Sequence, residues 1–226
     1  MSIHPSILEY STHDLEQKLQ LLKINKKGLK LLLNLDNIVL NLHLDFIGKD
    51  FAQTRKVMKS LDMKTVFQEL QKVFSKTKLN ITIHLMNELE DYKLDFVFLK
   101  NYKPNKNWSY TFYTNKNYTK IYKELAEYAK IGIWLDFKEW EKFDFEKDQG
   151  SEYLIMTVKA GLSGQNKVKS SNEKIIQLAK TNQTKNFLMD GGWQMNEIKI
   201  LAQENKLINL NFVSYSSFWK TLGVNL

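Results

Sequence analysis

The sequence predicts a (β/α)8 barrel, a closed ring of eight parallel strands with helices around it. Two observations lead to this fold class. Short apolar segments alternate with amphipathic segments along the whole chain, which is typical of parallel sheets covered by helices. Eight strand candidates in 226 residues suit one closed barrel better than an open sheet. With two prolines and nine glycines the chain has no obvious linker, so we expect one domain over residues 1–226.

The predicted strands are nearly continuously apolar, as expected when both faces of a parallel sheet are buried. In chain order they are IHPSIL (3–8), IVLNLHLD (38–45), NITIHLM (80–86), LDFVFLK (94–100), IGIWLD (131–136), EYLIMTV (152–158), NFLMD (186–190) and LINLNFV (207–213).

The predicted helices have apolar residues at i, i+3 and i+4. The clearest are 12–23, 62–75, 117–130 and 172–180. Asp62 and Asn117 are predicted to cap two of them, because their side chains can accept hydrogen bonds from free backbone N–H groups. The crossover around ELEDYKL, between the third and fourth strands, is the shortest.

The charge of the chain is basic, with 33 Lys and Arg against 25 Asp and Glu, a formal net charge of +8. Arg55 is the only arginine, and the lysines are spread out. Nucleic-acid readers usually exploit the bidentate fork of arginine, so this pattern favours solvated surfaces over nucleic-acid binding. A diffuse positive field would also attract small anions such as sugar phosphates.

Several absences narrow the class of protein. No apolar run approaches the roughly 18 residues needed to cross a bilayer, and MSIHPSILEY lacks the layout of a signal peptide. The chain has no cysteine, which excludes disulfides, thiolate metal ligands and a thiol nucleophile. We therefore expect a cytoplasmic protein that acts neither on membranes nor on nucleic acid.

Candidate metal ligands stand at the carboxyl ends of the predicted strands, where barrels place their chemistry. His43 and Asp45 lie two positions apart, so their side chains share one side of a strand. His84 and Asp190 end the third and seventh strands. Two imidazoles and two carboxylates at one rim suit zinc, or Fe²⁺, Mn²⁺ or Co²⁺. The alternative is that each residue is a separately satisfied strand end.

Other polar or thioether residues end the remaining strands. They are Ser6, Lys100, Asp136, Met156, Thr157, Ser214 and Ser216. Glycine-containing turns follow two strands, AGLSGQ at 160–165 and DGG at 190–192. Glycine lets backbone N–H groups approach a phosphate, and barrels commonly bind phosphate in this region.

Four segments together resemble the ribulose-phosphate 3-epimerase family. They are HLD at 43–45, IHLM at 83–86, LIMTVKAGLSGQ at 154–165 and MDGG at 189–192, and the resemblance begins at PSIL, 5–8. The family normally has H-x-D-x-M-D-G-x-F, V-H-L-M, M-T-V-x-P-G-x-G-G-Q and V-D-G-G at these points. The order and spacing of the four segments carry more weight than any one of them.

The resemblance implies a barrel of the ribulose-phosphate-binding type that interconverts D-ribulose 5-phosphate and D-xylulose 5-phosphate. It implies a divalent metal, with zinc expected first, held by His43, Asp45, His84 and Asp190. Asp45 and Asp190 would also exchange protons with the two faces of C3, while the metal stabilises the enediolate charge. Barrels of this family commonly associate, so a homo-oligomer is also implied. The implied substrate-binding residues are Ser6, His84, Met86, Met156, Gly164, Gly191, Gly192 and Ser216. For both methionines, ordinary core packing is an equal alternative.

The chain departs from the family pattern in the loops. Residues 47–49 are Ile, Gly and Lys instead of Met, Asp and Gly, and Lys100 stands where the family usually has histidine. Ala160 and Ser163 replace a proline and a glycine. Tyr215 replaces the glycine before Ser216, and Trp193 is bulkier than usual. Two alternatives therefore stay open: an epimerase of another ketose phosphate, and an inactive barrel that acts as a binding protein.

Overall fold

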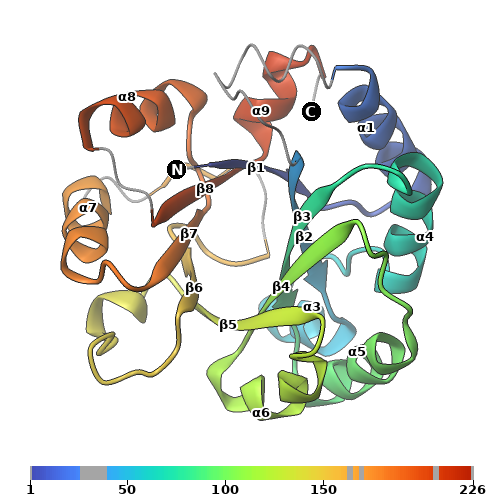
Figure 1. Cartoon of the computed structure of the whole chain (residues 1–226), viewed down its shortest axis with the longest axis horizontal. Helices are drawn as coiled ribbons and strands as arrows, with labels where there is room; N and C mark the ends of the chain where they lie inside the picture. The colour runs from blue at the N-terminus through green and yellow to red at the C-terminus, as the bar shows by residue number, and fades with distance from the viewer. Residues whose placement is uncertain (1, 26–39, 162–164, 168–170, 206–208, 225–226) are drawn as a thin grey trace.

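Eight parallel strands form a closed barrel in the computed structural model, and the helices surround it (Figure 1). Each strand pairs with its neighbours in chain order, and β1 pairs with β8. The structure describes residues 2–25, 40–161, 165–167, 171–205 and 209–224. The predicted (β/α)8 fold is thus confirmed. Within the described part of the chain, no helix has the length and apolar character that crossing a membrane requires.

The strands agree closely with prediction except for the fourth. Their bounds are β1 Ile3–Ile7, β2 Leu40–Ile47, β3 Leu79–Met86, β4 Trp108–Thr114, β5 Ala129–Leu135, β6 Glu152–Met156, β7 Asn186–Asp190 and β8 Leu210–Ser214. Residues 38–39 and 207–208 of two predicted strands lie outside the described residues.

Helices or short helical turns lie between the strands and after the last one. The α-helices are α1 Thr12–Ile24, α3 Lys49–Arg55, α4 Met63–Phe74, α5 Leu89–Asn101, α6 Thr119–Tyr122, α7 Ser171–Thr181, α8 Met195–Asn205 and α9 Ser216–Thr221. The 3₁₀ turns are η1 Lys116–Tyr118, η2 Lys123–Leu125 and η3 Trp140–Lys142.

The main core lies between the strands and the helices, because every second strand residue points outward. Leu42, Leu44, Ile81, Ile83 and Phe112 are such residues, and all are fully buried. Their burial by α-helical apolar faces stabilises the barrel, at about 25 cal/mol per Å² of apolar surface removed from water. The intervening positions of the same strands face the interior of the barrel, where polar residues are common.

The predicted fourth strand at 94–100 is wrong, because this segment belongs to α5. Tyr92 and Leu99 are buried and Phe96 is half-buried, a spacing that fits a helix, while Leu94 and Val97 are exposed. Lys100 is therefore not a strand end. It lies on the surface, where it pairs with Glu124 at 3.1 Å.

The fourth strand, β4, reads WSYTFYT. It was not predicted because polar and apolar residues alternate along it. Trp108, Tyr110 and Phe112 are buried, while the polar residues alternate with them. Its apolar side faces the helices and its polar side faces the barrel interior, so it lacks the continuous apolar run expected of a buried parallel strand.

Of the two predicted helix caps, only Asp62 is correct. Its carboxylate accepts a hydrogen bond from the backbone N–H of Thr65 at 2.9 Å, at the start of α4. Asn117 is wrong as a cap, because Asn115 accepts the hydrogen bond from the Asn117 backbone at 3.0 Å. The predicted helix 117–130 is broken into η1, α6 and η2, and β5 begins at Ala129.

Asp91 fixes the loop that follows β2. Its carboxylate accepts hydrogen bonds from the backbone N–H groups of Lys49 at 2.9 Å and Asp50 at 3.2 Å, at the start of α3. Gly48 makes this approach possible, since a Cβ there would lie 2.2 Å from the Asp91 carboxylate. The unusual Ile-Gly-Lys sequence at 47–49 thus lets the loop after β2 pack against Asp91 of α5.

We predict that Asp91→Ala destabilises the protein by about 1–2 kcal/mol, because free N–H groups at a helix start lose their acceptor. Asp91→Asn should recover part of the loss, since an amide oxygen also accepts these hydrogen bonds. The measurement is urea unfolding followed by circular dichroism. An alanine variant as stable as the original protein would show that this contact does not hold the loop.

Candidate metal centre

Three strands bring the four predicted ligands to one point at the carboxyl end of the barrel. The parallel register sets Asp45 of β2 beside His84 of β3, and His43 lies one interior layer below Asp45 on the same strand. Asp190 ends β7, where it pairs with Met156 of β6. The four residues offer ligand atoms that all lie within 4.8 Å of one another. The sequence prediction that they converge is therefore correct.

The two carboxylates each approach both imidazoles. Asp45 Oδ1 lies 3.3 Å from His43 Nε2 and 3.2 Å from His84 Nδ1. Asp190 Oδ2 lies 3.9 Å from His43 Nε2 and 3.7 Å from His84 Nδ1. Both imidazoles are fully buried, while the Asp45 and Asp190 side chains are 8% and 13% exposed. The group is enclosed on the histidine side and open towards the carboxylates.

The arrangement fits a divalent metal. Zinc holds nitrogen and oxygen ligands at about 2.0–2.2 Å in a tetrahedron, which sets neighbouring ligand atoms about 3.4 Å apart. The four measured nitrogen–oxygen distances, 3.2 to 3.9 Å, bracket this value. His43 Nε2 is buried and has no hydrogen-bond partner among the described residues, although it points at both carboxylates. A metal would satisfy this orphaned nitrogen.

The imidazoles and carboxylates of the group shift one another's pKa values, and the directions of these shifts favour a bound cation. Burial alone would raise the pKa of Asp45, but the imidazoles of His43 and His84 outweigh it and lower that pKa. Burial alone would lower the pKa of His84, but the nearby carboxylates of Asp190 and Asp45 raise it. Positive charge is thus favoured between the carboxylates, and a cation can replace the imidazole proton there.

Thr82, on β3, orients the ring of His43. Its hydroxyl oxygen lies 2.9 Å from His43 Nδ1 and donates to the carbonyl of Leu42 at 3.2 Å. Since the hydroxyl proton goes to that carbonyl, the oxygen accepts from His43 Nδ1–H and leaves a lone pair on Nε2. Metal-binding histidines typically have such a partner on the second nitrogen. The sequence prediction missed Thr82, although its place two residues before His84 sets it on the same strand face.

A cavity of about 60 Å³ opens beside the metal group. Six of the eight residues that the family resemblance implied for substrate line it, and His84 does not. Ser6, Met86, Met156, Gly191, Gly192 and Ser216 all line it. Gly164, also implied, lies outside the described residues. Ser6 donates a hydrogen bond to Asp45 Oδ2 at 2.8 Å, so it holds a carboxylate of the group as well as facing the cavity.

The glycines at 191 and 192 are required by the backbone. Their φ angles are +108° and +70°, in the region that side chains disfavour. A Cβ on Gly192 would lie 2.3 Å from the backbone nitrogen of Lys167, so the segment after β6 passes directly over this turn. Tight packing of two neighbouring loops therefore closes one side of the cavity.

Tyr215 lines the same cavity and is held from outside by Lys18 of α1. The Lys18 ammonium donates a hydrogen bond to the Tyr215 hydroxyl at 2.8 Å and lies 4.6 Å from the centre of its ring. It also pairs with Glu9, just after β1. These contacts join residues almost two hundred positions apart, so the sequence alone gave no sign of them. The contacts with Lys18 therefore hold the side chain of Tyr215 in its position beside the cavity.

Asp136, another predicted strand-end residue, does not belong to the metal group and lies beside Arg55 of α3. Its carboxylate lies 3.5 Å from the guanidinium of Arg55. Arg55, at the end of α3, also lies over the ring of Phe51 at 5.5 Å. The single arginine of the chain thus ties α3 to the end of β5, which makes its role here structural.

Comparison with known proteins gives the fold and nothing finer. No protein-family model matches the chain, and no curated protein matches it. A mutant tryptophan synthase alpha-subunit from the hyperthermophile Pyrococcus furiosus is similar in structure, with a TM-score of 0.56. The match has 15% sequence identity and covers 98% of this chain and 90% of that one. The fold is a TIM barrel. At this identity the similarity carries no information on activity.

We predict that Thr82→Val, which removes the hydroxyl and keeps the shape, weakens zinc binding about 10–100-fold. Thr82→Ser should bind zinc nearly as tightly as the original protein. Competition against a chromophoric chelator measures both affinities at fixed pH. Equal zinc affinity in the valine and original proteins would show that Thr82 does not orient His43.

Proposed function

We propose that the chain is a metal-dependent epimerase that interconverts D-ribulose 5-phosphate and D-xylulose 5-phosphate. The observation that carries this proposal is the position of Asp45 and Asp190, two carboxylates from β2 and β7 that share one buried group with two imidazoles. Inversion beside a carbonyl needs one base for each face of the carbon, and carboxylates from separate strands can supply them.

The chain's own residues would act as follows. One aspartate removes the proton from C3, which leaves an enediolate, and the other returns a proton to the opposite face. Ser6 holds Asp45 through its hydrogen bond and so fixes the direction of that carboxylate. Met86 and Met156, both buried, would exclude water from the reacting carbon.

The metal would be held by His43, Asp45, His84 and Asp190, with zinc expected first and Fe²⁺, Mn²⁺ or Co²⁺ as alternatives. When bound, it would supply positive charge that stabilises the oxygens of the substrate as they become negative. It would also favour the ionised form of the carboxylates, so that one of them can act as a base near neutral pH.

The phosphate is proposed to bind at the turns after β6, β7 and β8. Gly191 and Gly192, with their positive φ angles, and Ser216 line this end of the cavity. Tyr215 stands between this region and Lys18. Because the tyrosine occupies space that a glycine would leave free, an epimerase of another ketose phosphate remains a second candidate.

Turnover of D-ribulose 5-phosphate by the purified protein, before and after chelation, tests the proposal. We expect activity that is lost with the chelator and restored by added metal. Inactivity on all pentulose phosphates, with zinc bound, would contradict the proposal and favour the binding-protein alternative. Measurement of the size of the protein in solution would test the expected homo-oligomer separately.

Asp190→Asn is predicted to lower kcat by at least 10²-fold and to keep the fold, because general acid–base groups typically contribute 10²–10⁴-fold. Circular dichroism and the unfolding midpoint check the fold. Asp95→Asn, a change of a half-buried carboxyl outside the metal group, serves as the matched control. Activity of the Asp190 variant within about threefold of the original would show that the two-carboxylate assignment is wrong.

Changing Tyr215 tests how the cavity selects its substrate. If the ring obstructs the phosphate, Tyr215→Gly should lower KM for D-ribulose 5-phosphate, while Tyr215→Phe, which removes only the hydroxyl bonded to Lys18, should leave it nearly unchanged. Steady-state kinetics at saturating metal measure both. An unchanged KM in the glycine variant would show that the ring does not obstruct the phosphate.

A further inference from the structure

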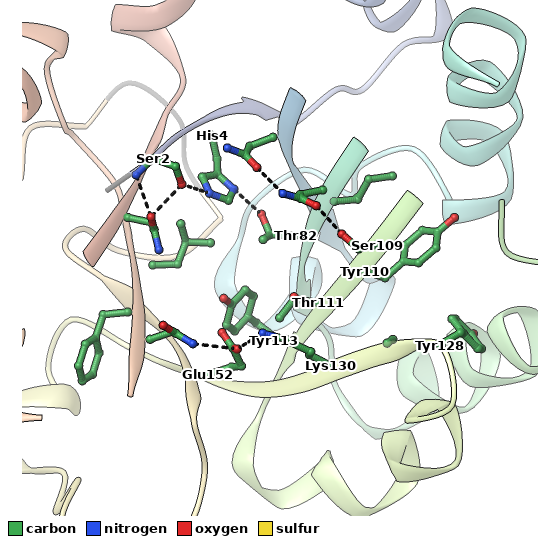
Figure 2. Close-up of a pocket in the computed structure, with 18 of the residues that line it drawn as sticks. Ser2, His4, Thr82, Ser109, Tyr110, Thr111, Tyr113, Tyr128, Lys130 and Glu152 are labelled. Atoms are coloured by element: carbon green, nitrogen blue, oxygen red, sulfur yellow. Dashed lines mark hydrogen bonds and ion pairs between the residues drawn. The ribbon is translucent and has the colours of Figure 1, made fainter. Parts of the chain in front are cut away.

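A second, larger cavity opens at the opposite end of the barrel, where the strands begin. Its volume is about 540 Å³, within the range of small-molecule sites, against about 60 Å³ beside the metal group. Figure 2 shows side chains from around the barrel facing this space. We call it the N-terminal cavity. No residue of the metal group lines it.

Polar side chains from every strand surround the N-terminal cavity. Each comes from the first or second residue of its strand, or, for β1, from the residue just before it. They are Ser2, Asn41, Asn80, Ser109, Lys130, Glu152, Asn186 and Asn211. The interior of a TIM barrel is usually filled by layers of branched apolar residues, so this ring leaves a hollow where packing is the rule.

The ring carries little net charge. Its single lysine and single glutamate pair with each other, with Lys130 Nζ 2.8 Å from Glu152 Oε1. Deeper in the cavity, burial and the nearby charge of His43 lower the pKa of His4 to about 3, so this histidine is neutral. A charged ligand would lose its hydration in the cavity, and the ring offers no unpaired side chain of opposite charge to compensate. The N-terminal cavity therefore favours a neutral occupant.

Two hydroxyls inside the cavity lack partners. The side chain of Tyr113 is buried, with the residue 3% exposed, and its hydroxyl has no hydrogen bond to any described residue. The hydroxyl of Thr111, two residues earlier on β4, is equally free within the described part of the chain. Each hydroxyl keeps some access to the cavity, so it can donate to and accept from a hydroxyl of an occupant.

We propose that the N-terminal cavity binds a small neutral polyhydroxylated molecule, a monosaccharide or cyclic polyol. Hydrogen-bonding groups stand all around the cavity rather than on one wall, which matches a ligand with hydroxyls around a ring. The ring of Tyr113, in the wall of the cavity (Figure 2), offers an apolar surface to its C–H groups. Amide and hydroxyl side chains can both donate and accept, as sugar hydroxyls do.

This cavity has a physical link to the metal group. His4 lies in its wall and has a ring nitrogen 3.3 Å from the hydroxyl oxygen of Thr82 (Figure 2). Thr82 in turn bonds His43, a proposed metal ligand. The binding proposal itself does not depend on the proposed epimerase activity, because the ring and its free hydroxyls belong to the other mouth of the barrel.

The test is binding of D-glucose, D-xylose and myo-inositol to the full chain, measured by isothermal titration calorimetry and saturation-transfer NMR. We expect saturable binding of at least one probe at one site per chain, and weaker binding of D-glucose 6-phosphate. Tyr113→Phe removes only the free hydroxyl and should weaken binding at least tenfold. Thr111→Val, of nearly the same shape, should weaken it in the same direction.

Tyr122→Phe is the control, since the Tyr122 hydroxyl has no hydrogen-bond partner among the described residues and Tyr122 does not line the cavity. It should bind the probe as the original chain does. Repeating the titration in Asp190→Asn separates this proposal from the catalytic one, and binding should persist there. No saturable binding of any probe, or binding unchanged in both Tyr113→Phe and Thr111→Val, would overturn the proposal.

Discussion

The register of the closed parallel barrel is the constraint on which the rest of the structure depends. Closure through β1 and β8 fixes which side chains face inward, and the pairing of Asp45 with His84 and of Ser6 with His43 follows from it. A slip of one residue in β2 would turn both His43 and Asp45 outward. The apolar packing of the outward residues against the helices is therefore what holds the polar group together.

Burying two imidazoles and two carboxylates costs desolvation free energy, which apolar packing around them does not offset. The group offsets part of this cost internally, because each carboxylate lies near both rings. Thr82 and Ser6 satisfy further atoms, yet His43 Nε2 keeps no hydrogen-bond partner among the described residues. Such a cluster is poorly explained as a stabilising element and well explained as a site that a divalent cation completes.

Sequence patterns predicted the elements whose hydrophobic period is simple, and the ligand group followed from their ends. Four residues spread from 43 to 190 could be brought together only because the fold class implied one common rim. The prediction failed at β4, since WSYTFYT buries its apolar face outside and its polar face inside the barrel. Contacts such as that between Lys18 and Tyr215 depend on tertiary geometry that no local pattern encodes. The polar ring of the N-terminal cavity was not predicted, because Asn41 and Asn211 fell inside predicted strands and Ser109 lies in β4, which the sequence patterns missed.

The central claim is that His43, Asp45, His84 and Asp190 bind one metal ion together. A crystal structure of the zinc-loaded protein, with anomalous data collected on both sides of the zinc edge, tests it most directly. The account predicts a single strong anomalous peak about 2.0–2.2 Å from His43 Nε2, His84 Nδ1 and an oxygen of each aspartate. An absent peak at this position in fully loaded crystals, or an ion that Asp190 does not reach, would contradict it.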